Sequence, residues 1–361
     1  MSGLLYRKDM DAVRARLTTW WNGGDIGRPV MQIAAPRRKP LEDIPEMPKP
    51  DGWVTDYSAS NFDYRVNLAQ RAFAKYQLFG EAVPAISPHT GAGSVALYLG
   101  CQGKETPGTV WFLPCVADPD KARIEYDRDN FYWDFTLRLS RRMVELARGK
   151  MVVEFPDLIE GLDILASLRG TEPMLLDLLE RPEWVHSALR RITDAYFHYY
   201  DMLYDLMRDE VGGSIYWAWA PGRVAKLQCD CSAMISPAQF KEFMLPVLQE
   251  MTERLSYSLY HLDGPVCLQH HAALCSLPSL DMIQWTPGAG VEPTWHKRWW
   301  PVFHKTFDAG KKLYLHWDGE PTVEDIRVYR REFGPRFKQF LFSMRANSAE
   351  RARDLLNAAE E

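Results

Sequence analysis

Short apolar runs alternate with helical patterns in the second half of the chain, from about residue 150 onward. This alternation is typical of βα units, in which parallel strands are joined by the helices that cover them. The predicted strands are residues 151–155, 214–219, 258–262, 281–285, 312–317 and 339–343. The fold class indicated is therefore α/β, and the number of strands favours a (β/α)8 (TIM) barrel over the alternative, a doubly wound sheet.

Two helices between these strands are indicated by apolar residues at steps of three and four. A long helix is predicted to begin near Pro182. The next helix begins with a capping box, because Ser236 is followed by Pro237 at the first helical position and by Gln239 at the third. Its apolar positions continue to Leu255.

The first part of the chain has a different pattern. Helical spacing at residues 10–21 and 62–80 flanks a strand-like run at residues 30–34. Prolines crowd the stretch that follows this run and exclude a regular helix there. We therefore predict two parts, an N-terminal extension of residues 1–130 that packs on the barrel and the barrel itself in residues 131–361.

Charge and composition narrow the classes of partner. The chain has 43 Lys and Arg against 48 Asp and Glu, a formal net charge of −5, without long blocks of one sign. Nucleic acid and anionic membranes are therefore excluded as default partners. No signal-peptide run and no stretch of about 18 uncharged apolar residues is present, so a cytoplasmic location is expected. Six cysteines are too few for a disulfide scaffold and are expected as thiols.

A His-x-Asp-Gly sequence occurs twice, each time at the end of a predicted strand. The first copy holds His261 and Asp263, and the second holds His316 and Asp318. Residues two apart on a strand point to the same face, so each pair can share a metal ion or a proton. A hydrogen-bonded histidine and an Asp-Gly turn would explain either copy alone. The repetition at two strand ends of one barrel favours a shared site at its mouth.

Further candidates lie at other strand ends. Asp230, between two cysteines in a loop, is predicted either as an acid–base residue or as a residue that fixes its loop by hydrogen bonds. Gln284 is a candidate substrate contact. Tryptophans in or beside predicted strands offer flat faces for a planar ligand or a methylated cation, unless they point outward beneath helices. These predicted wall residues are Trp217, Trp219, Trp285 and Trp317.

The order of these motifs resembles the uroporphyrinogen decarboxylase superfamily, in particular its methyltransferase-like branch associated with corrinoid proteins. Residues 227–246 run Leu-x-Cys-Asp-x-Ser-x-Met-Ile-Ser-Pro-x-x-Phe-x-x-Phe-x-x-Pro. They are followed by His-Leu-Asp-Gly-Pro at 261–265 and by Leu-Asp-Met-Ile-Gln-Trp-Thr-Pro-Gly-Ala-Gly at 280–290. The resemblance covers roughly residues 150–356 and implies a (β/α)8 barrel with its site at the carboxyl ends of the strands.

The resemblance also implies a ligand set, from which this chain departs. The zinc-dependent methyltransferases of the superfamily hold the metal with a His-x-Cys strand end and a later cysteine. Here Asp263 stands in place of the first cysteine, and the last strand, at residues 343–346, has no cysteine. The zinc site expected is therefore His261 and Asp263 with His316 or Asp318. The arginine-rich N-terminal motif of true porphyrinogen decarboxylases is missing, which argues against that reaction.

These features together lead to one expected function and two alternatives. The expected function is a methyltransferase that moves a methyl group from a small substrate to a corrinoid protein, with zinc as Lewis acid. Its metal ligands would be His261, Asp263 and His316, and Asp230 and Asp318 would be its catalytic residues. One alternative is a metal-free decarboxylase or lyase of the same fold. The other is a non-catalytic barrel that binds a ligand on its tryptophans.

Overall fold

A seven-stranded sheet forms the centre of the fold in a computed structural model, which describes residues 3–50, 61–106 and 109–361. Neighbouring strands of this sheet are parallel except for β1 and β2, which are antiparallel. Its strands in spatial order are β2 (Tyr76–Gly80), β1 (Val30–Pro36), β13 (Phe340–Arg345), β12 (Lys312–His316), β11 (Met282–Thr286), β10 (Tyr257–Asp263) and β9 (Val224–Gln228).

Three short strand pairs accompany the large sheet. The parallel pair is β3 (Ala85–Ile86) with β6 (Val152–Val153), and the hairpins are β4 (Gln102–Thr106) with β5 (Thr109–Leu113) and β7 (Ser214–Tyr216) with β8 (Ala218–Ala220). The backbone N–H of Phe155, just beyond β6, donates to the carbonyl of Ile215 in β7 at 3.2 Å. The α/β arrangement is consistent with a barrel, but the ladder of the large sheet does not close, since it ends at β2 and β9 in the part of the chain described.

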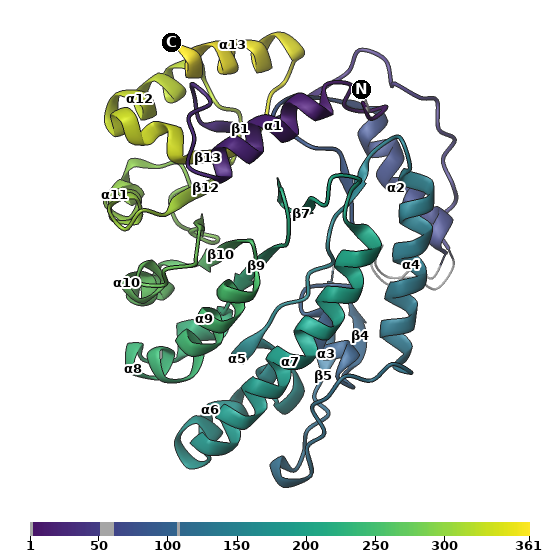
Figure 1. The fold of residues 1–361 in the computed structure, drawn as a ribbon, viewed down its shortest axis with the longest axis vertical. Helices are drawn as coiled ribbons and strands as arrows, with labels where there is room; N and C mark the ends of the chain where they lie inside the picture. Colours follow the sequence, from purple (N-terminus) through teal and green to yellow (C-terminus); the bar gives the residue numbers. More distant parts are fainter. Residues whose placement is uncertain (1–2, 51–60, 107–108) are drawn as a thin grey trace.

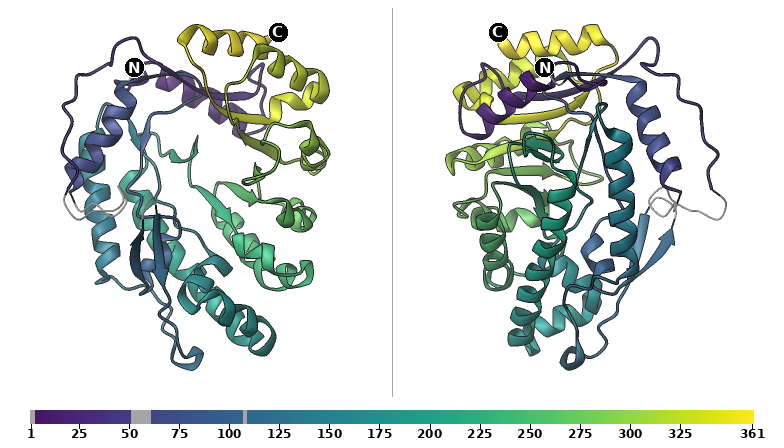
Figure 2. Two further views of the ribbon diagram at one scale, coloured as in Figure 1. Left: turned by 180° about the vertical axis from the view of Figure 1, so that it is seen from behind. Right: turned by 45° about the vertical axis from the view of Figure 1, so that its right-hand side comes forward.

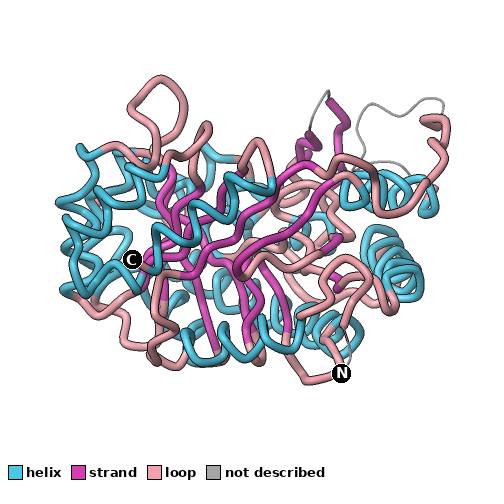
Figure 3. The backbone as a smooth tube through the Cα atoms, turned by 90° about the horizontal axis from the view of Figure 1, so that it is seen from above, coloured by secondary structure: helices cyan, strands magenta, loops and turns pink. Residues whose placement is uncertain are grey.

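Helices surround the strands (Figures 1 and 3). Figure 2 shows α2 and α4 side by side, on the side of the molecule away from α10 and α11. No helix among the described residues combines the length and apolar character needed to cross a membrane. The helices are α1 (Met10–Trp21), α2 (Phe62–Ala74), α3 (Ser94–Tyr98), α4 (Phe131–Ala147), α5 (Gly161–Arg169), α6 (Thr171–Glu180), α7 (Pro182–Met207), α8 (Pro237–Gln239), α9 (Leu245–Arg254), α10 (His271–Cys275), α11 (Trp300–Asp308), α12 (Val323–Phe333) and α13 (Ala349–Glu360).

The predicted helix starts are confirmed. The long helix α7 begins at Pro182, and its buried residues follow the apolar stripe. The capping box is present as well, since the Ser236 hydroxyl accepts from the Gln239 backbone N–H and the Gln239 side chain accepts from the Ser236 backbone N–H. The helix continues through one π-helical turn, Phe240–Met244, into α9.

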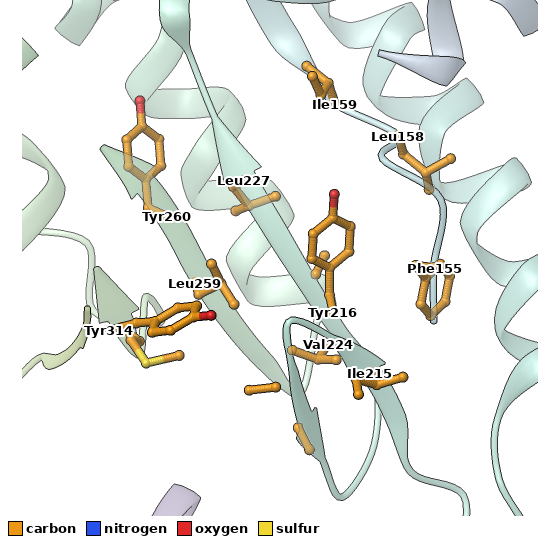
Figure 4. Packing of buried hydrophobic residues seen from close by; sticks show 14 of the residues in the cluster. Phe155, Leu158, Ile159, Ile215, Tyr216, Val224, Leu227, Leu259, Tyr260 and Tyr314 are labelled. Carbon is orange, nitrogen blue, oxygen red and sulfur yellow. The ribbon is translucent and has the colours of Figure 1, made fainter. Parts of the chain in front are cut away.

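One buried apolar core runs through the described part of the fold and includes side chains from the sheet, the short strand pairs and the helices. Figure 4 shows Tyr216 from β7, Leu227 from β9 and Tyr260 from β10 among these side chains. All three are at most 6% exposed. The core therefore extends across the place where the strand ladder is interrupted, and side-chain packing joins the two parts of the fold there.

Three sequence predictions need correction. The predicted extension, residues 1–130, does not only pack on the barrel, because β1 pairs with β13 inside the sheet and β2 pairs with β1. The helix predicted over 62–80 ends at Ala74, and the chain then forms β2. The strand predicted over 214–219 is broken at Trp217, whose φ of 57° reverses the chain into the β7–β8 hairpin. The domain boundary at residue 130 remains a prediction.

Candidate functional site

Three side chains with metal-ligand atoms converge at the carboxyl ends of β9 and β10. Asp230 lies two residues beyond β9, and His261 and Asp263 are the third-last and last residues of β10. One ligand atom from each of the three lies within 4.8 Å of the others. Because β9 and β10 are hydrogen-bonded neighbours, the sheet itself brings these residues together.

The orientation of His261 is fixed by the neighbouring strand. His261 is opposite Gln284 in the register of β10 and β11, and its Nδ1 hydrogen-bonds Oε1 of Gln284. The amide oxygen can only accept, so Nδ1 carries the hydrogen and Nε2 keeps its lone pair. The Gln284 amide is itself oriented, since its Nε2 donates to Oγ1 of Thr286 at 2.7 Å.

The histidine is also held in its neutral form. Burial is the largest effect on the pKa of His261, which lies below its ordinary value even though the hydrogen bond to Gln284 acts in the opposite direction. Its Nε2 lies 3.9 Å from Oδ2 of Asp263, too far for a direct hydrogen bond. A neutral imidazole with a free Nε2 facing two carboxylates is the form that binds metal ions.

The loop that carries Asp230 is anchored by a second carboxylate, Asp163 of α5. The two oxygens of Asp163 accept from the backbone N–H groups of Asp230 and Cys231, each at 2.8 Å. Nε2 of Gln228 donates to Oδ2 of Asp230 at 2.9 Å. Asp230 is exposed as a residue, but partial desolvation of its carboxyl group and, secondly, the negative charge of Asp163 raise the pKa of Asp230 to about 7. The role predicted as an alternative for Asp230, accepting backbone hydrogen bonds that fix this segment, is thus taken by Asp163, and Asp230 begins a short 3-10 helix, Asp230–Met234.

A buried ion pair lies behind this loop. Nζ of Lys226, on β9, lies 2.7 Å from Oδ1 of Asp157, and the lysine side chain is 1% exposed. Lys226 also donates to Oε1 of Gln228, the residue that donates to Asp230. A chain of polar contacts thus runs from Asp157 through Lys226 and Gln228 to Asp230.

A cavity of about 520 Å³ opens beside Asp230. Most of its wall is apolar and comes from β5, from α5 and from the segment before α5. The residues that line it include Val110, Trp111, Phe112, Ile159, Asp163, Ile164, Gln228 and Asp230. A small organic molecule bound here would lie against Asp230, one of the three clustered side chains, and against the apolar part of the wall.

Trp217 is held in a strained backbone conformation beside His261. A positive φ is rare for a bulky residue and persists only where the surroundings enforce it. Here the Trp217 N–H donates to Oε1 of Glu154 at 2.5 Å, and Nε2 of Gln32 donates to the Trp217 carbonyl at 3.0 Å. The indole packs edge-on against the His261 ring, with centroids 5.5 Å apart. Burial raises the pKa of Glu154 to about 7.

The second His-x-Asp-Gly does not join this cluster. His316 is exposed and lines a different cavity, of about 220 Å³, together with Gln32, Trp217 and Arg345. Asp318 accepts a hydrogen bond from Oγ1 of Thr294 at 3.2 Å and so stabilises a loop. The convergence predicted for the two copies is therefore not found, and Asp230 takes the place in the cluster that was predicted for His316.

Three of the four predicted wall tryptophans belong to the core. Trp219, Trp285 and Trp317 are 1%, 0% and 3% exposed. Nε1 of Trp219 donates to Asp209 at 2.7 Å, and Trp317 stacks on Trp295. The bend at Trp217 explains part of the difference, because it removes the alternation that would have placed Trp217 and Trp219 on one face.

Sequence reasoning did not identify Asp163, Glu154 or Lys226. Lys226 interrupts an otherwise apolar run after Pro221 and Gly222, and this concealed β9 as a strand. Glu154 was recognised only as part of a predicted strand. A charged residue inside an apolar strand pattern was the available signal in both cases, since such residues are rarely buried without a partner.

Comparisons with known proteins bear on the fold. No family model and no curated protein matches the chain. Among solved structures, the chain is similar to a methyltransferase from Methanosarcina mazei, with a TM-score of 0.59 and 12% sequence identity over 96% of this chain and 98% of that chain. At this identity the likeness concerns the fold alone. The α/β architecture predicted from the sequence is thus shared, over nearly its whole length, with a protein described as a methyltransferase.

Proposed function

We propose that this protein is a metal-dependent methyltransferase that takes a methyl group from a small substrate and passes it to a corrinoid carried by a partner protein. The observation that carries the proposal is the convergence of Asp230, His261 and Asp263 beside a largely apolar cavity. The fold shared with the Methanosarcina methyltransferase supports this class of reaction. The resemblance of residues 227–290 to the corrinoid-associated branch supports the choice of acceptor.

The three side chains fit zinc. Imidazole nitrogen and carboxylate oxygen are both zinc ligands, and three protein ligands with one open position are typical of catalytic zinc. The hydrogen bond from His261 to Gln284 is the kind of outer contact that orients a metal-binding histidine. Zinc bound here would supply Lewis acidity toward the heteroatom that carries the methyl group.

The other residues receive different roles from those first predicted. Asp230, predicted as an acid–base residue, would be a ligand, and Gln284, predicted as a substrate contact, would orient His261. The apolar wall of the cavity would hold the substrate and exclude water, and Asp163 would keep the Asp230 loop in place through its two backbone contacts. Trp217 would limit the space on the other side of His261.

Methyl transfer to free cob(I)alamin tests the proposal. The zinc-loaded protein is incubated with trimethylamine, dimethyl sulfide or anisole as N-, S- and O-methyl donors, and methylcobalamin is followed by its absorbance. We expect formation with at least one donor and its loss in Asp263→Asn, while Asp318→Asn stays active. Equal rates in the wild type and Asp263→Asn would contradict the role of the cluster.

One observation favours a second candidate, a metal-free lyase or decarboxylase. A carboxyl group with a pKa of about 7, as for Asp230, is suited to donate and accept a proton near neutral pH. This candidate predicts activity that persists after treatment with a chelator, whereas the methyltransferase predicts its loss. The non-catalytic barrel loses its basis, since three of the four tryptophans that would have formed its ligand wall are in the core.

A further inference from the structure

Two cysteines lie side by side at the base of the β4–β5 hairpin, away from the candidate metal ligands. Cys101 directly precedes β4, and Cys115 follows β5 by two residues. Their Sγ atoms are 3.8 Å apart. A disulfide has an S–S length of about 2.05 Å, so the sulfur atoms need to approach by about 1.8 Å to form one.

The two thiols differ in their exposure to solvent, so we expect them to react in a fixed order. Cys101 is buried, and its Sγ contacts the carbonyl of Ser167 in α5 at 3.3 Å. Cys115 is exposed, and its backbone N–H donates to the carbonyl of Leu168 at 2.9 Å, which fixes its place beside α5. A reagent from solution therefore reaches Cys115 first and Cys101 afterwards.

The electrostatics agree with this order. The hydrogen bond from the Cys101 thiol lowers the pKa of Cys115 to about 7, while the same contact raises that of Cys101. Cys115 is therefore the thiol with a substantial thiolate fraction at neutral pH. The thiolate is the reactive form of cysteine, and an accessible thiolate beside a second thiol is typical of redox-sensitive pairs.

We propose that Cys101 and Cys115 form a modification site for hydroperoxides, which convert the pair to a disulfide. The Cys115 thiolate attacks the terminal oxygen of the hydroperoxide, the O–O bond breaks, and Cys115 becomes a sulfenic acid while water or an alcohol leaves. Cys101 then attacks the sulfenic sulfur, the S–S bond forms, and water leaves with the thiol proton. Both cysteines are oxidised, the peroxide is reduced, and a cellular dithiol would reverse the reaction.

The bond would fix one wall of the cavity beside Asp230. Strands β4 and β5 lie between the two cysteines in the sequence and pair with each other, and Val110, Trp111 and Phe112 of β5 line that cavity. Linking the ends of the hairpin, where Cys101 contacts α5, restricts its movement relative to the rest of the wall. This restriction of the cavity wall is expected whichever reaction takes place in the cavity.

The test uses the full-length, reduced protein treated with equimolar hydrogen peroxide, followed by intact mass and non-reducing peptide mapping. We expect the loss of two hydrogen atoms, a single peptide pair joining Cys101 to Cys115, and full reversal by dithiothreitol. Cys275→Ser is the matched control, because Cys275 is a half-buried thiol paired with His271 elsewhere, and it should oxidise like the wild type.

Single variants test the order of attack. In Cys101→Ser, dimedone should trap a sulfenic acid at Cys115, since no second thiol is present to resolve it. In the surface variant Cys115→Ser, Cys101 should stay reduced at the same dose. If Cys101→Ser, which alters a buried residue, does not fold, the test rests on Cys115→Ser and on the wild type. A wild type that stays reduced, pairs either cysteine with another partner, or stops at sulfinic acid on Cys115 would overturn the proposal.

Discussion

Substitution of Lys226 by methionine should strongly destabilise the protein, because it leaves a buried charge without its partner. Nζ of Lys226 lies 2.7 Å from Oδ1 of Asp157, and the two side chains are 1% and 17% exposed. Burial by itself raises the pKa of Asp157, but the charge of Lys226 and its hydrogen bond outweigh that effect and hold the pKa below its ordinary value. Without Lys226, the buried carboxylate loses the nearby positive charge and keeps only weaker support, chiefly the hydrogen bond from Tyr216.

The magnitude follows from the burial of the pair. Removal of one partner of a buried ion pair costs about 3–5 kcal/mol, whereas an exposed pair contributes about 0–1 kcal/mol. Arg331→Met is the matched control, since Nη2 of Arg331 lies 2.6 Å from Glu324 and the two side chains are 64% and 62% exposed. The double variant Lys226→Met with Asp157→Asn should regain most of the loss, because the carboxylate that was paired with Lys226 is then neutral.

The assay is urea unfolding at pH 7, followed by tryptophan fluorescence. We expect the free energy of unfolding to fall by about 3–5 kcal/mol in Lys226→Met and by less than about 1 kcal/mol in Arg331→Met. The reasoning is refuted if Lys226→Met resembles the control. It is also refuted if the double variant is as unstable as the single one, since the loss would then not come from the unpaired charge of Asp157.

Three further predictions concern the site and its supports. Gln284→Leu should weaken zinc binding by about 10–100-fold in a competition titration with a chromogenic chelator, because His261 loses its orienting hydrogen bond; unchanged affinity would argue against that role. The folded-state pKa of Glu154 is about 7, above its ordinary value of 4.5, so the stability supplied by this group is present below about pH 4.5 and lost as pH rises to about 7. Glu154→Gln should therefore be more stable than the wild type by up to about 3 kcal/mol at pH 8 but not at pH 4, and parallel pH–stability curves would contradict this. Gly161→Ala should lower the free energy of unfolding by about 1–2 kcal/mol in the same urea assay, since Gly161 has a φ of 59° and an added Cβ would lie 2.6 Å from Sδ of Met244; no change would show that the backbone relaxes.

Helices and strands that depend mainly on the hydrophobic pattern of neighbouring residues were predictable from the sequence. The apolar stripe of α7 and the capping box at Ser236 depend on residues within one helix, so they are visible without any knowledge of the fold. The strands β10 to β13 have apolar runs that are buried on both faces, and their predicted ranges agree with the structure to within two residues. Strand β9 was missed because its central residue, Lys226, is charged and is stabilised by Asp157, about 70 residues away.

The candidate site was predicted in part, and the reason lies in the order of the strands. The first His-x-Asp-Gly lies on β10, which neighbours β9, and this adjacency brings Asp230 to His261 and Asp263. The second copy lies at the end of β12, separated from β10 by β11. There His316 lines a different cavity, with Gln32, Trp217 and Arg345, whereas His261 lies with Asp230 and Asp263. The spacing of a motif does not reveal the order of strands, so its repetition was an insufficient guide.

The bend at Trp217 was not predictable from local preference. Aromatic residues are common in strands, and residues 214–219 have no glycine that would indicate a positive φ. The conformation is enforced by Glu154 and Gln32, which bind the Trp217 backbone from two other segments. Strain that is held by distant contacts leaves no local signal in the sequence.

The most direct test of the central claim is the metal content of the protein, purified without chelator and supplemented with zinc, in the wild type and in two single variants. If Asp230, His261 and Asp263 hold the metal, elemental analysis will find about one zinc per chain in the wild type and in His316→Ala, and none in His261→Ala. Absence of zinc from the wild type, or its retention in His261→Ala together with loss in His316→Ala, would contradict the account.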